Sequence, residues 1–190
     1  QSYYDSGDWR GTWALDGGML LNQGVHLIDL LLWWMGGIDE AFGRLARVSP
    51  AKETEDAAVG AIRFASGAIG SIEADTIAQP DNYDNEIALF GERGTVIVGG
   101  IGLRHVRRWT ADGGVGAPPP ENADADEHAS MYAHWIARMK GERGELIEPA
   151  DARRSLEAIF ALYESARLGT AVRMPLPAFD TRSMASIFRT

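Results

Sequence analysis

Cysteine is absent from the 190-residue sequence. Its absence excludes a disulfide framework and thiol catalysis, and it is compatible with the cytoplasmic location that we expect. Long apolar runs are missing as well. The longest extends only from Leu30 to Met35, far short of the roughly 20 residues that cross a bilayer. We therefore expect no membrane partner.

Basic residues are few, since 18 Lys and Arg stand against 27 Asp and Glu and give a net charge of −9. A nucleic-acid ligand requires clustered positive charge, so we expect no nucleic-acid partner. A complete dinucleotide fingerprint is also missing. Gly100 and Gly102 begin a G-x-G motif, but His105 stands at the third glycine position and the pair follows a predicted strand rather than opening a helix. We expect no cofactor site within these residues.

Motifs for metal or nucleophilic chemistry are lacking too. His128 and His134 are six residues apart, so they lie on different sides of a helix and cannot form the i, i+4 pair of a zinc site. No serine has a G-x-S-x-G context, which argues against an esterase triad. We expect neither a metal site nor a nucleophilic serine.

Helical periodicity and turn residues predict an α+β fold from a sequence that is 45% hydrophobic. A largely buried helix is predicted over 18–35, with a stop at Gly36 and Gly37. Two amphipathic helices are predicted later, one over 128–139 and one that Asp151 caps and Gly169 ends. Short segments rich in Val and Ile predict strands over 41–48, 57–65, 67–78, 84–90, 94–98, 103–110 and 171–177.

The order of these elements predicts one domain over residues 1–190, built on an open-faced, mostly antiparallel mixed sheet. Turn residues at Ser66 and Gly67, and again over 91–94, predict two hairpins. Helices would pack on one face of the sheet. The other face would be available for a homodimer or homotetramer.

The stretch GGMLLNQGVHLID, residues 17–29, places Asn22, His26 and Asp29 in a predicted helix that is otherwise almost all apolar residues and glycine. At helical spacing, Asn22, His26 and Asp29 fall within a narrow arc. Such a stripe either makes hydrogen bonds inside the core or lines a cavity, and the spacing alone leaves both open. A histidine close to a carboxylate can accept a proton from a hydroxyl near neutral pH.

Several segments together resemble the C-terminal domain of the glucose-fructose oxidoreductase / inositol dehydrogenase / MocA (Gfo/Idh/MocA) oxidoreductases. They include WRGTWALDGGMLLNQGVHLIDLLLWWMGG, ETEDAAVGAIRFASGAIGSIEADT and LFGERGTVIV. The resemblance implies the substrate-binding and oligomerisation half of an enzyme, with NAD or NADP bound mainly by an N-terminal Rossmann domain. Since the chain starts at Gln1 rather than at methionine, we expect a fragment that lacks that domain and is inactive alone.

The resemblance also implies roles for the polar stripe. His26 would be the acid/base acting on the hydroxyl that is oxidised, and Asp29 would bind substrate hydroxyls. Asn22 belongs to the same catalytic group, but it stands where inositol-type dehydrogenases carry aspartate. A neutral amide thus replaces a carboxylate beside the histidine, which departs from the pattern of a simple polyol dehydrogenase. The context WRGTW…NQGVHLID resembles more closely the family members that act on larger sugars, including nucleotide-linked ones.

The aromatic N-terminal segment would then form the lip of the substrate pocket. Aromatic faces suit sugar rings, and an arginine fork suits a carboxylate or a phosphate. Packing of an entry segment explains the same residues equally well. The residues concerned are Tyr3, Tyr4, Trp9, Arg10 and Trp13.

The function that we expect is NAD(P)-dependent oxidation of a hydroxyl on a sugar, a cyclitol or a nucleotide-linked sugar. Two alternatives remain open. The chain could be a non-catalytic sugar-binding or dimerisation module, or it could belong to an NAD-dependent glycosidase of the same family, which oxidises its substrate only transiently.

Overall fold

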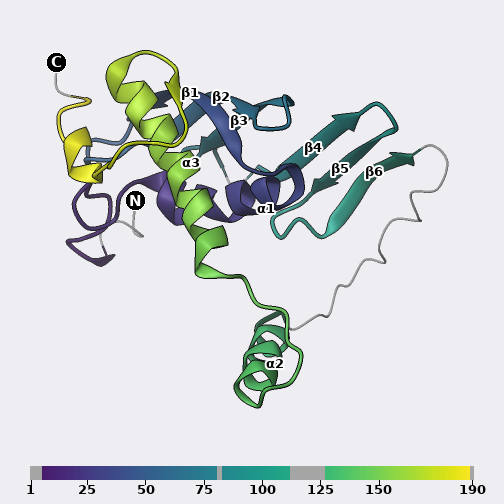
Figure 1. Ribbon diagram of the computed structural model, residues 1–190. Helices are drawn as coiled ribbons and strands as arrows, with labels where there is room; N and C mark the ends of the chain where they lie inside the picture. Colours follow the sequence, from purple (N-terminus) through teal and green to yellow (C-terminus); the bar gives the residue numbers. More distant parts are fainter. Residues whose placement is uncertain (1–5, 81–82, 112–126, 189–190) are drawn as a thin grey trace. The chain divides into compact units, whose positions relative to one another are not determined.

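The chain folds into two compact units in a computed structural model that describes residues 6–80, 83–111 and 127–188 (Figure 1). The first unit contains the described residues up to Ala78 together with those from Pro149 onward. The second contains the described residues between Gln79 and Glu148. Helices and open antiparallel sheets make this an α+β fold, as predicted.

The sheet of the first unit has four strands in the order β3-β2-β1-β7. The strands are β1 (Ile38–Ala46), β2 (Ala57–Phe64), β3 (Ile69–Asp75) and β7 (Val172–Arg173). All of their pairings are antiparallel, and the predicted hairpin at Ser66 and Gly67 joins β2 to β3. The predicted closing strand over 171–177 is reduced to the two residues of β7.

Two long helical segments complete this unit. The first starts as a π-helical segment, η2 (Leu20–Gly24), and continues as α1 (Val25–Met35), which ends at Gly36 with a φ of +83°. The second is α3 (Pro149–Leu168), which starts two residues before the predicted cap at Asp151, since proline suits the first helical position. A 3₁₀ turn, η3 (Thr181–Met184), follows β7.

Helix α3 packs directly on one face of the sheet (Figure 1). A Cβ atom at Gly43 of β1 would lie 2.5 Å from the carbonyl oxygen of Leu162, and one at Gly60 of β2 would lie 2.7 Å from its side chain. Glycine at both positions therefore allows the close approach of α3. Ala41, Ala58 and Ile62 are buried on the same face, whereas Val59 and Ile69, on the opposite face, are 53% and 83% exposed.

The second unit holds a separate three-stranded antiparallel sheet and the helix α2 (Glu127–Met139). Its strands are β4 (Glu86–Gly91), β5 (Gly94–Gly99) and β6 (His105–Ala111). The predicted open-faced, antiparallel arrangement is confirmed, and it is divided between two sheets that share no pairing among the described strands. The predicted hairpin over 91–94 and the predicted helix over 128–139 are confirmed. Within the described ranges, no helix is long and apolar enough to span a membrane.

Candidate active site

The helix that carries the predicted site residues begins after a tight glycine turn. Gly17 and Gly18 have φ angles of +79° and +108°, which only glycine adopts readily. Both are buried. A Cβ atom at Gly18 would lie 2.5 Å from Oε2 of Glu55, so the position also excludes any side chain for lack of space.

Asn22 lies within the π-helical segment η2, whereas His26 and Asp29 lie on α1. A π turn forms i to i+5 hydrogen bonds and changes the angular spacing of its side chains, so the uniform α-helical arc predicted for the three residues does not apply. The structure still brings Asn22, His26 and Asp29 onto successive turns of one helical segment. Isolated π turns are frequent at functional sites.

A buried carboxyl group holds the first residue of η2. Glu55 is 0% exposed, and its Oε1 accepts hydrogen bonds from the backbone N–H of Leu20 at 2.9 Å and from the hydroxyl of Tyr163 at 2.6 Å. Burial raises the pKa of Glu55, although these two hydrogen bonds act to lower it. Burial and the neighbouring Glu55 carboxyl raise the pKa of Tyr163 well above its ordinary value.

The Asp16 carboxylate joins Asn22 to the N-terminal segment. Its Oδ2 accepts the backbone N–H of Gly11 at 2.7 Å, and its Oδ1 accepts the side-chain amide of Asn22 at 3.0 Å. The amide oxygen of Asn22 in turn accepts a hydrogen bond from Gln23 at 3.1 Å. Asn22 is half-buried and oriented by its neighbours.

His26 and Asp29 have different surroundings. Asp29 is half-buried and accepts a hydrogen bond from the hydroxyl of Ser155, a buried residue of α3. His26 is exposed, and none of the described residues forms a hydrogen bond or an ion pair with its imidazole. A buried hydrogen-bonded network therefore does not explain His26, whose ring is open to a ligand.

The predicted lip residues divide into two kinds. Trp9 is 43% exposed, and the guanidinium of Arg10 lies 4.4 Å from the centre of its ring, a cation–π contact. Trp13 is only 1% exposed and packs edge-on against Tyr163, with 5.3 Å between ring centres. Trp13 is thus a core residue, which removes it from the candidate site. The remaining two, Tyr3 and Tyr4, lie outside the described residues.

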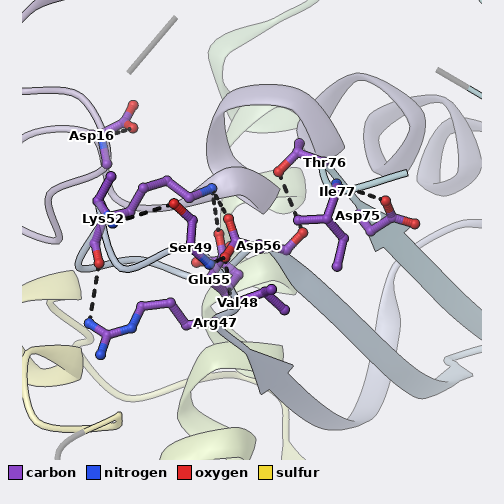
Figure 2. Close-up of polar contacts among 12 residues, drawn as sticks. Asp16, Arg47, Val48, Ser49, Lys52, Glu55, Asp56, Asp75, Thr76 and Ile77 are labelled. Carbon is purple, nitrogen blue, oxygen red and sulfur yellow. Dashed lines mark hydrogen bonds and ion pairs between the residues drawn. The ribbon is translucent and has the colours of Figure 1, made fainter. Parts of the chain in front are cut away.

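A second buried carboxylate lies next to Glu55 and has other partners. Asp56 forms an ion pair with Lys52 and accepts the backbone N–H groups of Val48 and Ser49 at 2.7 and 2.6 Å (Figure 2). Burial acts to raise the pKa of Asp56, but the hydrogen bond from Lys52 and those from the two backbone N–H groups outweigh it and lower this pKa. Asp56 therefore orders the loop before β2, not the helix.

Three of these residues were missed in the sequence: Asp16, Glu55 and Ser155. The ETED run at 53–56 carried a signal, because consecutive acids directly before a buried strand must find partners. The partners of Glu55 are Leu20 and Tyr163, and the partner of Ser155 is Asp29. These partners lie 35 to 126 residues away in the sequence, so local pattern does not reveal them. Within the described residues, no cluster of His, Asp and Glu could hold a metal ion.

The comparisons with known proteins identify the family. The family model described as GFO/IDH/MocA C-terminal domain matches residues 1–97, which is half of the chain. The chain belongs to the GFO/IDH/MocA oxidoreductase family. No curated protein sequence matches it.

Solved structures of the family extend the match beyond residue 97. The WlbA dehydrogenase from Bordetella pertussis, in complex with NADH and UDP-GlcNAcA, is 32% identical with a TM-score of 0.82, and the match covers 93% of this chain and 51% of that one. GenD2 from gentamicin A biosynthesis, in complex with NAD, is 27% identical with a TM-score of 0.67, covering 90% of this chain and 52% of that one. The GFO/IDH/MocA chain described here thus spans about half the length of these structures.

Proposed function

We propose that these residues form the substrate-binding and catalytic part of an NAD(P)-dependent oxidoreductase that acts on a hydroxyl group of a nucleotide-linked sugar. The observation that carries this proposal is the exposed imidazole of His26, on a helix where Asp16 and Ser155 hold Asn22 and Asp29 in place. The similarity to WlbA, whose structure contains NADH and UDP-GlcNAcA, supports the substrate class.

His26 would accept the proton of the substrate hydroxyl, because imidazole is the side chain that most often serves as a general base and this ring is exposed. Asn22 and Asp29 would orient the sugar by hydrogen bonds. Trp9 and Arg10 would contact the rest of the substrate, the ring by stacking and a carboxylate or phosphate by the guanidinium fork. The nicotinamide, when bound, supplies the hydride acceptor.

The described residues do not fit a dinucleotide site of the Rossmann type. Gly100 and Gly102 precede β6, a strand, and no helix starts there to receive a pyrophosphate. We therefore assign the cofactor, NAD or NADP, mainly to a Rossmann domain outside these residues, and no residue described here is assigned to it.

The proposal is tested with the protein encoded by the complete gene, NAD and NADP, and a panel of nucleotide-linked sugars, free sugars and cyclitols. We expect reduction of the cofactor with a nucleotide-linked sugar, and a loss of about 10²-fold or more in kcat for His26→Ala. The control His128→Ala changes an exposed histidine of α2 and should retain wild-type kcat. Undiminished turnover of His26→Ala would overturn the assigned role.

The same assay separates the alternative functions. Sugar binding without turnover would favour the non-catalytic module. Release of free sugar without net cofactor reduction would favour the NAD-dependent glycosidase.

We also propose that the exposed face of the four-stranded sheet pairs two copies of the chain in a homodimer or homotetramer. Val59 and Ile69 lie on this face and expose 53% and 83% of their surface, which favours burial against a partner. Sedimentation analysis should show an oligomer that Ile69→Glu dissociates. The control Ile101→Glu, on an isoleucine of the second unit that is 70% exposed, should leave the oligomer intact. A wild-type monomer would contradict this proposal.

A further inference from the structure

Glu55 is a buried titratable residue to which the proposed reaction assigns no role. Its carboxyl group is fully buried, and its Oε2 has no hydrogen-bond partner among the described residues. Burial of a carboxyl group with incomplete hydrogen bonding is unfavourable, and apolar side chains of similar size would fill the same space at lower cost. The contacts of its other oxygen explain what this residue does.

The Oε1 atom of Glu55 accepts a hydrogen bond at the start of the helical segment formed by η2 and α1, here called the site helix. Met19, at the N-cap position of η2, forms no side-chain capping hydrogen bond, and the first turn contains no acidic residue. The first N–H groups of a helix lack partners within the helix and must be satisfied from outside. Glu55 accepts the N–H of Leu20 from 35 residues away, and a carboxyl group is favoured at this end of a helix.

Tyr163 holds the same oxygen from the opposite side. Its hydroxyl donates to Oε1 at 2.6 Å, and its ring is fixed by edge-on packing against Trp13. Gly18 leaves the space that the two side chains occupy. Three segments therefore meet at Oε1 of Glu55: the start of η2, the loop before β2 and helix α3.

We propose that Glu55 and Tyr163 are a positioning pair that sets where the helix carrying Asn22 and His26 begins, and thereby where the imidazole of His26 meets the substrate hydroxyl. Neither residue touches substrate. The inference rests on the proposed function. His26 follows Leu20 by only six residues, so a shift of the helix start is transmitted to the imidazole.

The test compares Glu55→Ala with Asp56→Asn in the protein encoded by the complete gene. The two carboxyl groups are neighbours and equally buried, but Asp56 contacts Lys52 and the loop before β2. We expect Glu55→Ala to lower kcat/KM by about 10²-fold, the loss that a misplacement of about 1 Å can cause. Asp56→Asn should lower the unfolding temperature while the folded fraction retains wild-type kcat/KM.

Two conservative variants sharpen the comparison. Glu55→Gln retains an oxygen that can accept both hydrogen bonds, so its kcat/KM should stay close to wild type. Tyr163→Phe removes one of the two donors and should give a smaller loss than Glu55→Ala. Should Glu55→Ala fail to fold, Tyr163→Phe decides, since wild-type kcat/KM in that variant would overturn the proposal.

A second readout separates this proposal from the proposed function. Amide hydrogen exchange at Leu20 and Asn22 needs no enzyme activity, and we expect it to accelerate in Glu55→Ala but not in Asp56→Asn. Unchanged exchange together with unchanged kcat/KM in Glu55→Ala would overturn the positioning role. Full activity of His26→Ala would overturn the proposed function, and the exchange rates would still decide whether Glu55 holds the helix start.

Discussion

Asn22 donates a hydrogen bond from its side-chain amide to Oδ1 of Asp16 at a distance of 3.0 Å. A carboxylate therefore lies beside position 22 although position 22 itself carries a neutral amide. Asp16 also accepts the backbone N–H of Gly11, so its charge is held in place from two sides. An aspartate at position 22 would remove the amide donor and set a second carboxylate against the first.

We predict that Asn22→Asp lowers the free energy of unfolding at neutral pH by about 1 kcal/mol, because a half-buried hydrogen bond is lost and two carboxylates repel each other. Two adjacent carboxylates raise the pKa of one of them, so the variant should regain stability as pH falls through that raised pKa. Urea unfolding at neutral pH and at about pH 5 measures both effects.

The exchanged pair Asp16→Asn with Asn22→Asp is the matched control, because it restores one donor and one acceptor at the same two positions. It should recover part of the loss. Wild-type stability of Asn22→Asp alone at neutral pH would contradict the prediction.

Glu55 and Asp56 should respond to pH in opposite directions, since the pKa of Glu55 is raised and that of Asp56 is lowered. Glu55 contributes stability that is fully present below its ordinary pKa of 4.5 and is lost as pH rises through its raised value. Asp56 contributes stability that is present above its ordinary pKa of 3.8 and is lost as pH falls through its lowered value.

Relative to wild type, Glu55→Gln should therefore become more stable as pH rises, and Asp56→Asn should become less stable. Differences in the free energy of unfolding, measured across acidic and neutral pH, give the two slopes. Slopes of the same sign would show that one of the two pKa directions is wrong.

Gly18→Ala should destabilise the protein by about 3 kcal/mol or more, because a strained φ and a steric clash act together. The φ of Gly18 is +108°, and the added Cβ would lie 2.5 Å from Oε2 of Glu55. Gly36→Ala is the control, since Gly36 has a φ of +83° with no atom near its Cβ direction. Gly36→Ala should lower the free energy of unfolding by only about 1 kcal/mol. Equal losses for Gly18→Ala and Gly36→Ala in thermal unfolding would contradict the steric clash at Gly18.

Ser155→Ala should weaken substrate binding through Asp29, whose carboxylate it would leave without the hydroxyl donor of α3. We expect a loss of about 1 kcal/mol in stability and, in the enzyme that we propose, a higher KM with kcat less affected. The control is Ser165→Ala. Ser165 is also buried, but its hydroxyl accepts a hydrogen bond from Gly43 and donates one to Thr170. This variant should lose stability with no change in KM.

Local pattern predicted the elements that depend on local chemistry. The buried helix over 18–35 and its end at Gly36 follow from apolar periodicity and a glycine stop, and both hairpins follow from their turn residues. The π-helical start was not predicted, and neither was the contact of its first residue, Leu20, with Glu55, which lies 35 residues away. Trp13 could not be told from Trp9, because an aromatic side chain in an entry segment suits both a core and a pocket.

The contacts that hold the site helix can form only in a certain order while the chain is being synthesised. Leu20, Asn22 and Asp29 leave the ribosome before Tyr163 and Ser155, which lie on α3 and complete the contacts of Glu55 and Asp29. A nascent chain that stops before Pro149 therefore contains every residue of the polar stripe but lacks the two side chains that α3 contributes to it. The contacts of the proposed site are complete only when α3 has been released and docks.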